Sequence, residues 1–292
     1  MKPSFRCFLF FLLAAGLFCS PAAPGLSSLV PAALADEAGD LRNAQAAIEK
    51  ADYGKAVSLL TPLADKGNAE ALYVLGRLTL DGKGVKKSEQ RAAQLFRQAA
   101  EKGDISAQNA WGTAQASGQG VRRNYREAAR WFRKAAEQGL AMAQYNLGYL
   151  YAYGRGVPKD ENAAIDWYSR AANQGLADAQ YSLGWTYLNS KGENQSDTKA
   201  VHWFEKAAEQ DNVKAQNNLA YMYAEGRGYA QDPVKAVQWY NRAAERGYAE
   251  AQYIWASCTS RAGACRRTTT RLWNGTARPP SKMSPRPSTA SA

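Results

Sequence analysis

One residue pattern returns every 36 positions along most of the chain. Glycine fills one position of the pattern, alanine a second and an aromatic ring a third. These columns are Gly76, Gly112, Gly148 and Gly184; Ala71, Ala107, Ala143, Ala179, Ala215 and Ala251; and Phe96, Phe132, Tyr168, Phe204 and Tyr240. Four of the rings directly follow a tryptophan: Trp131, Trp167, Trp203 and Trp239. Because several columns share one period, the chain is predicted to be a tandem array of one structural unit.

A single unit, residues 140–175, indicates what the pattern builds. Ala143 and Leu147 follow the i, i+4 spacing that places side chains on one face of a helix. Gly154-Arg155-Gly156 ends that helix, because glycine tolerates the left-handed backbone common after helix ends. The second half, AIDWYSRAANQG, is helical again, and Asp160 is placed to cap its first turn. Each unit is therefore a helix-turn-helix.

A helix pair of this kind cannot bury its apolar face alone, so neighbouring pairs must stack on one another. Hydrophobic residues make up 46% of the chain, which is enough for such a core and excludes disorder of the whole chain. The sequence predicts an all-α fold, an α/α solenoid of 36-residue helix-turn-helix repeats. The tryptophan column is expected to belong to the core.

The segments AQYNLGYLYAYGRGVPKD and AIDWYSRAANQG resemble the Sel1-like repeat family, which is related to tetratricopeptide arrays. The resemblance covers about Asn68 to Trp255, with five full units and the start of a sixth. Residues 36–67 are expected to form a divergent N-terminal helix pair, and residues 68–256 the array. The resemblance implies a right-handed superhelix that binds proteins or peptides. The fourth unit departs from the pattern at Ser190-Lys191-Gly192-Glu193, so its loop is expected to be less regular and more mobile.

The N-terminus has the pattern of an export signal. Lys2 and Arg6 precede an apolar run that ends at Phe18, which is too short for a membrane span of about 20 residues. Small residues at Ala33 and Ala35 predict cleavage before Asp36. Residues 1–35 are thus interpreted as a signal peptide, and the protein as periplasmic or secreted. The alternative is a retained anchor, so that the membrane is contacted only through the uncleaved signal.

The charge of the chain does not support nucleic-acid binding. Of the formal charge of +11, residues 1–35 carry +2 and residues 257–292 carry +7, which leaves +2 for the long middle. A near-neutral array lacks the basic groove that such binding needs. The four cysteines lie outside the repeats, and His202 is the only histidine, so neither a metal site nor a cofactor is expected. His202 itself is interpreted as an ordinary surface residue.

Catalytic motifs are sparse, so the protein is predicted not to be an enzyme. Ser196-Asp197-Thr198-Lys199 matches the S-x-x-K motif of β-lactamase-like and penicillin-binding hydrolases. The S-D-N and K-T-G partners of that motif are absent, and the segment lies where a helix should start. Ser196 or Asp197 as a helix N-cap explains it better, and the hydrolase remains the less favoured alternative.

In arrays of the resembled family, the first helix of each unit lines the inner, concave face. Three such helices carry a stripe of aromatic and amide side chains with polar edges, which suit a protein or peptide partner. The stripe comprises Tyr145, Tyr149, Tyr153, Tyr181, Trp185, Asn217 and Tyr221. Two alternatives stay open: the stripe binds peptidoglycan or another glycan, or some of these rings only pack between helices.

The repeat pattern breaks off after Tyr253, and residues 257–292 are expected to form a disordered basic tail. Back-translation of the tail in a frame moved by one nucleotide can give NLGQLYEQGRGVPQDYDKAVEWYRKAAEQ, which is a further repeat in register. Loss of one nucleotide from an asparagine codon after Tyr253 would produce the present sequence. Without the next repeat, an apolar face around Trp239, Tyr240 and Tyr253 is expected to be exposed.

Restoring the reading frame should raise solubility and thermal stability, because the last helix pair regains a following repeat to stack against. Light scattering and thermal unfolding of the restored and present chains compare the two. Equal behaviour would contradict the frameshift hypothesis, as would an intact reading frame at this point on resequencing of the locus.

Overall fold

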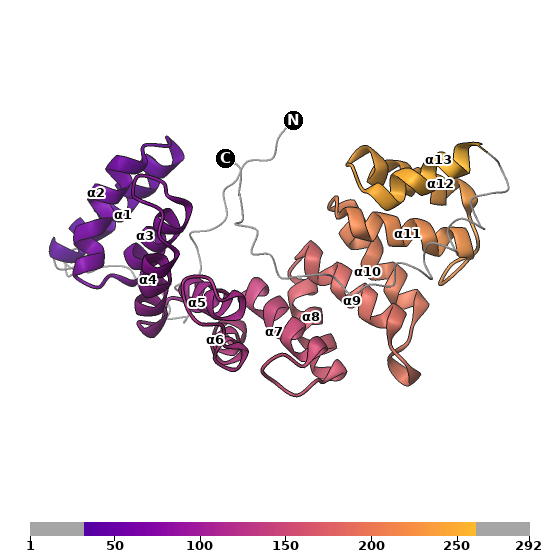
Figure 1. Ribbon diagram of the computed structural model, residues 1–292, viewed down its shortest axis with the longest axis horizontal. Coiled ribbons are helices and arrows are strands. Elements are labelled where there is room, and N and C mark those ends of the chain that lie inside the picture. The colour runs from indigo at the N-terminus through magenta and orange to yellow at the C-terminus, as the bar shows by residue number, and fades with distance from the viewer. Residues whose placement is uncertain (1–31, 261–292) are drawn as a thin grey trace, which may run out of the picture. The chain divides into compact units, whose positions relative to one another are not determined.

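The computed structural model describes the backbone of residues 32–260 and the side chains of residues 36–254 (Figure 1). This part of the chain is all-helical and contains no strand. The chain divides into two compact units, Met1–Gly39 and Asp40–Ala292, and the repeats lie in the second unit. The α-helices are α1 Ala32–Glu49, α2 Tyr53–Asp65, α3 Ala69–Asp81, α4 Glu89–Glu101, α5 Ile105–Ser117, α6 Tyr125–Glu137, α7 Ala141–Tyr153, α8 Glu161–Asn173, α9 Ala177–Asn189, α10 Asp197–Glu209, α11 Val213–Glu225, α12 Pro233–Glu245 and α13 Ala249–Ser260.

Helices pack mainly on their neighbours in sequence, which confirms the prediction of an all-α solenoid of stacked helix pairs. Capping residues fix where the second helix of each pair begins. Asp160 accepts a hydrogen bond from the Ala163 amide, as predicted, and Asp232 accepts one from Lys235 ahead of α12. Gly154 ends α7 at a φ of 64°, the left-handed backbone that glycine adopts without strain.

The glycine and aromatic columns meet at the crossing of the two helices in each repeat. A Cβ atom at Gly148 would lie 2.8 Å from Cδ1 of Tyr168, and one at Gly112 would lie 2.8 Å from Cδ1 of Phe132. Phe132 and Tyr168 are buried. The small residue on the first helix therefore lets the ring of the second helix fill the core at close range.

The tryptophan column packs against this core but is not fully covered. Each of these four rings is half-buried. A basic side chain three residues further along the helix lies over each ring, at 4.3 to 4.8 Å from the ring centroid. The pairs are Trp131 with Lys134, Trp167 with Arg170, Trp203 with Lys206 and Trp239 with Arg242. The outer face of the second helices is thus closed by cation–π contacts.

Glutamine side chains link successive repeats through hydrogen bonds. Gln180 donates to the Ala172 carbonyl of the preceding repeat and accepts from Gln210 at 2.7 Å. The carbonyl at the end of a helix is thereby satisfied. The fifth repeat has Arg246 in place of that second glutamine, and Oε1 of the buried Gln216 has no hydrogen-bond partner within the described part of the chain. Arg246 instead pairs with Asp211 at 2.6 Å.

Loops between the paired helices dock on the preceding repeat. A Cβ atom at Gly84, Gly120, Gly156 or Gly228 would overlap backbone atoms at the start of the second helix one repeat earlier. The fourth loop differs, because no described atom lies within 4 Å of the equivalent Cβ position at Gly192. There α9 ends at an extended Ser190, and a short 3₁₀ turn spans Gly192–Asn194. The predicted irregularity of this loop is confirmed, while its mobility stays a prediction.

The two ends of the described region modify the expected boundaries. Asp52 caps α2, the second helix of the leading pair, and Leu60 and Leu63 are buried. At the other end, α13 continues to Ser260, past the expected limit of the array at residue 256. The expected signal peptide lies almost wholly outside the described residues, as does the tail beyond Ser260.

The expected apolar face at the last helix pair is only partly present. Tyr253 is 60% exposed, but Tyr240 is 1% exposed and Trp239 is half-buried. The prediction of an exposed Tyr240 is therefore wrong. Its ring fills the crossing with α11, where Ala220 replaces the usual glycine, and so belongs to the core of its own repeat.

Gly156→Ala should destabilise the array more than Gly192→Ala. Both glycines have left-handed backbones, with φ of 73° and 69°, so each substitution costs about 1–2 kcal/mol of strain. Only at Gly156 does the new methyl group also overlap the Tyr125 backbone, which adds about 1–3 kcal/mol. Urea unfolding of both variants measures the difference, and equal shifts of the midpoint would contradict the docking of the loop.

Candidate functional site

The tyrosine stripe of α7 is placed on one face but at unequal depth. Tyr149 is buried, with 4% of its surface exposed, whereas Tyr145 and Tyr153 are half-buried. The rings of Tyr149 and Tyr153 lie 4.6 Å apart between centroids, and Tyr145 lies 5.7 Å from the core ring of Tyr168. The middle ring of the stripe is therefore covered, and Tyr145 and Tyr153 on either side of it are only partly accessible.

The same register on α9 and α11 gives two different surfaces. Tyr181 and Trp185 on α9 are half-buried, and Tyr181 lies 5.9 Å from the ring of Phe204. On α11, Asn217 and Tyr221 are buried at 5% and 7% exposure. Packing between helices, which the sequence left open as an alternative, thus describes the surroundings of Tyr149, Asn217 and Tyr221. The accessible part of the stripe consists of Tyr145, Tyr153, Tyr181 and Trp185.

Burial determines the protonation of these phenols. Desolvation raises the pKa of Tyr145 to about 12, and the nearby Asp178 carboxylate adds to the rise. Desolvation also raises the pKa of Tyr153 to about 12. For Tyr149, burial raises the pKa although the Arg155 charge opposes it. The stripe therefore presents neutral hydroxyls that donate hydrogen bonds, together with apolar ring faces.

The residue between the two loop glycines contacts the first residue of the second helix one repeat earlier, a pairing that the sequence reasoning missed. Lys83 lies 5.3 Å from the Tyr53 ring centroid, and Gln119 donates to Glu89 at 3.0 Å. In later repeats, Arg155 meets Tyr125 and Arg227 meets Asp197. A fixed offset of 30 residues was the available signal. In the fourth repeat Asn194 replaces this contact and donates to Asn162 at 2.8 Å.

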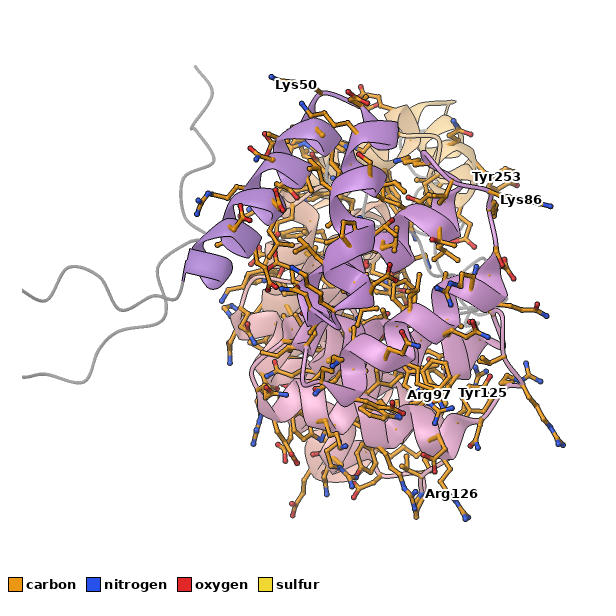
Figure 2. All side chains as sticks on the ribbon, turned by 90° about the vertical axis from the view of Figure 1, so that its left-hand side faces the viewer. Lys50, Lys86, Arg97, Tyr125, Arg126 and Tyr253 are labelled. Carbon is orange, nitrogen blue, oxygen red and sulfur yellow. The ribbon has the colours of Figure 1, made fainter. Side chains whose placement is uncertain are left out.

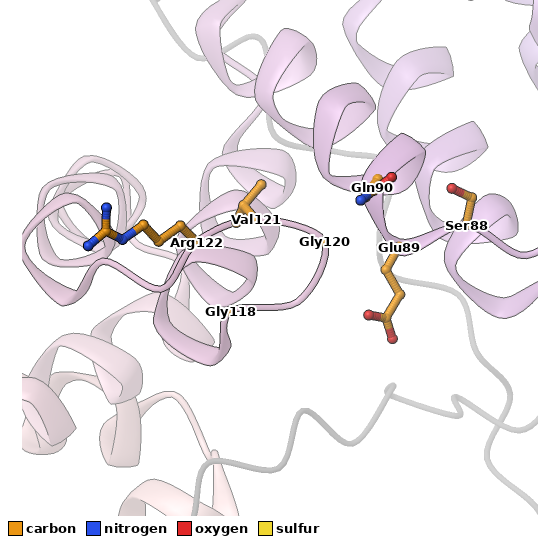
Figure 3. Close-up of a pocket in the computed structure, with 7 residues that line it drawn as sticks. All are labelled: Ser88, Glu89, Gln90, Gly118, Gly120, Val121 and Arg122. Atoms are coloured by element: carbon orange, nitrogen blue, oxygen red, sulfur yellow. The ribbon is translucent and has the colours of Figure 1, made fainter.

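An open groove of about 710 Å³ lies beside one of these contacts (Figure 3). It is lined by residues 118–122 of the loop after α5 and by the start of α4. The Ser88 hydroxyl in it already accepts a hydrogen bond from the Arg91 amide as the N-cap of α4. Glu89 accepts from Gln119. The Ser88 and Glu89 side chains are thus engaged in capping and in the contact between repeats.

The S-x-x-K segment forms the start of α10. The Ser196 hydroxyl accepts a hydrogen bond from the Lys199 amide at 3.3 Å, which confirms the N-cap interpretation. The Lys199 ammonium group lies 5.1 Å from the Tyr187 ring centroid. His202 is exposed and lies edge-on to Trp203. The described residues contain no cluster of three or more metal-ligating side chains and no helix long and apolar enough to cross a membrane.

Comparison with known families identifies the repeat. The Sel1 repeat model matches six consecutive segments, residues 39–68, 69–104, 105–140, 141–176, 177–212 and 213–248. The chain belongs to the Sel1 repeat family. The first match shows that the leading helix pair, expected from sequence to be divergent, is itself a Sel1 repeat. Sel1 repeats generally form scaffolds for protein–protein interaction.

Solved structures of the same family share the fold. A Sel1 repeat protein from Oxalobacter formigenes is 30% identical, with a TM-score of 0.71 over 83% of this chain and 98% of that one. The protein c5321, described as a protective antigen of uropathogenic Escherichia coli, is 31% identical with the same TM-score. That match covers 83% of this chain and 54% of c5321. No curated protein matches the chain significantly.

Phenolate formation in the folded Sel1 array should be delayed to about pH 12 for Tyr145 and Tyr153. The folded state holds these protons more tightly than the unfolded state, whose tyrosines ionise near pH 10. Their contribution to stability is therefore complete below about pH 10 and is lost as the pH rises through about 12. Ultraviolet titration of the protein and of its Tyr145→Phe variant measures this, and a folded-state titration complete near pH 10 would contradict the burial.

Proposed function

We propose that this Sel1 repeat protein is an exported scaffold that binds a protein or peptide partner at the cell envelope and carries no catalysis. The observation that carries the proposal is the accessible part of the stripe, Tyr145, Tyr153, Tyr181 and Trp185, on two successive first helices. Half-buried rings with neutral polar edges are effective anchors, since they add contact area at little cost in side-chain entropy.

Two observations support an envelope location. The first 35 residues carry the charge and apolar pattern of an export signal. The related c5321 is described as a protective antigen, and an antigen that gives protection is commonly accessible at a cell surface or in a secreted form. Under this proposal the mature array works outside the cytoplasm, and any contact with the membrane is made through an uncleaved signal.

The absence of catalysis is proposed from the chemistry of the polar residues. Ser196 is the serine of the S-x-x-K motif, and its hydroxyl oxygen accepts the hydrogen bond that caps α10. The Lys199 ammonium group lies over an aromatic ring. Neither arrangement provides the nucleophile and base that acyl transfer needs. The family fold is a non-catalytic repeat scaffold.

Trp185→Ala should weaken partner capture by about 5-fold or more, because an anchoring ring contributes on the order of 1–2 kcal/mol to binding. Tagged protein is used to recover partners from an envelope extract, with quantification by mass spectrometry. Trp167→Ala is the matched control, since Trp167 is also half-buried against the core but lies on a second helix.

Equal loss of capture in both variants, or a loss of helicity in Trp185→Ala, would show that Trp185 is a core residue and not part of the binding face. Sedimentation of the protein with purified peptidoglycan is run in parallel. Capture by the glycan that depends on Trp185, with no protein partner recovered, would overturn the protein-binding proposal in favour of glycan binding.

A further inference from the structure

The junction of the fourth and fifth array units, residues 177–212 and 213–248, shows how the loop arginine is neutralised. Nε and Nη2 of Arg227 donate to the two oxygens of Asp197 at 2.9 and 2.7 Å. This is the bidentate geometry in which a guanidinium binds a carboxylate most strongly. About 30% of each side chain is exposed. The pair of Arg227 and Asp197 thus shows that a carboxylate can bind an arginine at this position of the repeat.

Arg155 occupies the same position two repeats earlier but has no such partner. The residue that corresponds to Asp197 is Tyr125. The Arg155 guanidinium lies 5.5, 5.3 and 6.0 Å from the ring centroids of Tyr125, Tyr149 and Tyr153. Among residues 36–254, no carboxylate oxygen lies within 4.0 Å of its nitrogens. Nη1 of Arg155 donates a hydrogen bond to the Tyr125 hydroxyl at 3.4 Å. Arg155 is thus a half-buried cation held by aromatic rings and by a neutral hydroxyl, with no opposite charge against it.

The surroundings of Arg155 add to its positive potential. The Arg123 guanidinium lies 5.6 Å from the centroid of the Tyr125 ring. Arg122 and Arg126 are exposed on the same segment, and Figure 2 labels Arg126 and Tyr125 on the surface. The acid next in sequence, Glu127, is paired with Arg130 at 2.7 Å. An anionic ligand would therefore meet several cations and no unpaired acid of this segment.

We propose that Arg155 binds a carboxylate from an acidic peptide segment of the partner, at the junction of α6 and α7. The inference rests on the proposed scaffold function and names the chemistry that its partner must present. The partner carboxylate takes the place that Asp197 fills on Arg227. Tyr125 and Tyr153 hold the Arg155 guanidinium through their rings, and the exposed arginines of the 122–126 segment attract further acidic side chains.

An acidic peptide fits this site better than a nucleic acid or a phosphate-rich polymer. A guanidinium fork matches both carboxylate and phosphate, and the group that the protein itself places on the equivalent Arg227 is an aspartate carboxylate. The array as a whole is near neutral, as its sequence shows. A long polyanion would therefore find one local cluster and not a continuous basic groove.

A reciprocal exchange of the two residues tests the proposal. Tyr125→Asp gives Arg155 the internal carboxylate found at Arg227, so it should preserve or strengthen the contact between repeats while neutralising the Arg155 charge. Asp197→Tyr should free Arg227 and create a second site. Binding is followed by fluorescence anisotropy with a labelled hexaglutamate peptide at low salt. Hexaglutamine serves as the uncharged control, and an oligothymidylate of equal charge tests for binding to any polyanion.

The expected result is that the full chain binds hexaglutamate but not hexaglutamine. Tyr125→Asp should weaken this binding by about 10-fold or more, the scale of one charge-assisted contact. Arg155→Gln should have the same effect, and Asp197→Tyr should increase the number of sites or the affinity. Thermal unfolding of each variant separates lost binding from lost structure.

Three outcomes would overturn the proposal. Hexaglutamate binding that is unchanged in folded Tyr125→Asp and Arg155→Gln would show that Arg155 takes no part. Equal binding of the oligothymidylate, with the same dependence on Arg155, would indicate a general anion site. A lack of hexaglutamate binding by the full chain would also reject it. If envelope partners are still captured through Trp185 in any of these cases, the scaffold function stands and only the acidic-peptide inference fails.

Discussion

The contact between adjacent helix pairs is the interaction on which the rest of this structure depends. Within each pair, the ring of the second helix fills the crossing with a first helix that carries glycine or alanine. The remaining apolar face of the pair is covered only by the neighbouring pairs. The loop glycines then bring the backbone of one repeat onto the preceding one. Once these two contacts are satisfied, the remaining positions of the repeat are free to vary, and they hold the functional differences.

Variation is concentrated where the loops meet the preceding repeat. The same position carries a lysine over a ring, a glutamine bonded to a carboxylate, an arginine among tyrosines and an arginine in a bidentate ion pair. In the fourth repeat the loop glycine, Gly192, does not pack on the preceding repeat, and Asn194 contacts that repeat instead. The fold is therefore maintained by backbone contacts that all but one of these loops share. Side-chain chemistry at the junctions sets the charge and shape of the surface.

The period of the sequence was sufficient to predict the helix pairs, their caps and the stacked architecture, because these follow from local spacing and from the need to bury one face. The burial of individual side chains was harder to predict. The i, i+4 pattern placed Tyr145, Tyr149 and Tyr153 on one face but could not show that Tyr149 is buried. Tyr240 was wrongly expected on the surface, since its cover comes from its own repeat. Arg155 was read only as a helix-ending residue, because its tyrosine partner lies 30 positions earlier.

We propose that the first-helix face of this Sel1 array binds a protein partner. Site-specific photocrosslinking in living cells tests it most directly, with a photoreactive amino acid placed at Trp185 or, for comparison, at Trp167. A discrete protein adduct is expected from position 185 and none from position 167. Adducts from position 167 alone, or no protein adduct from position 185 in cells that make folded protein, would contradict it.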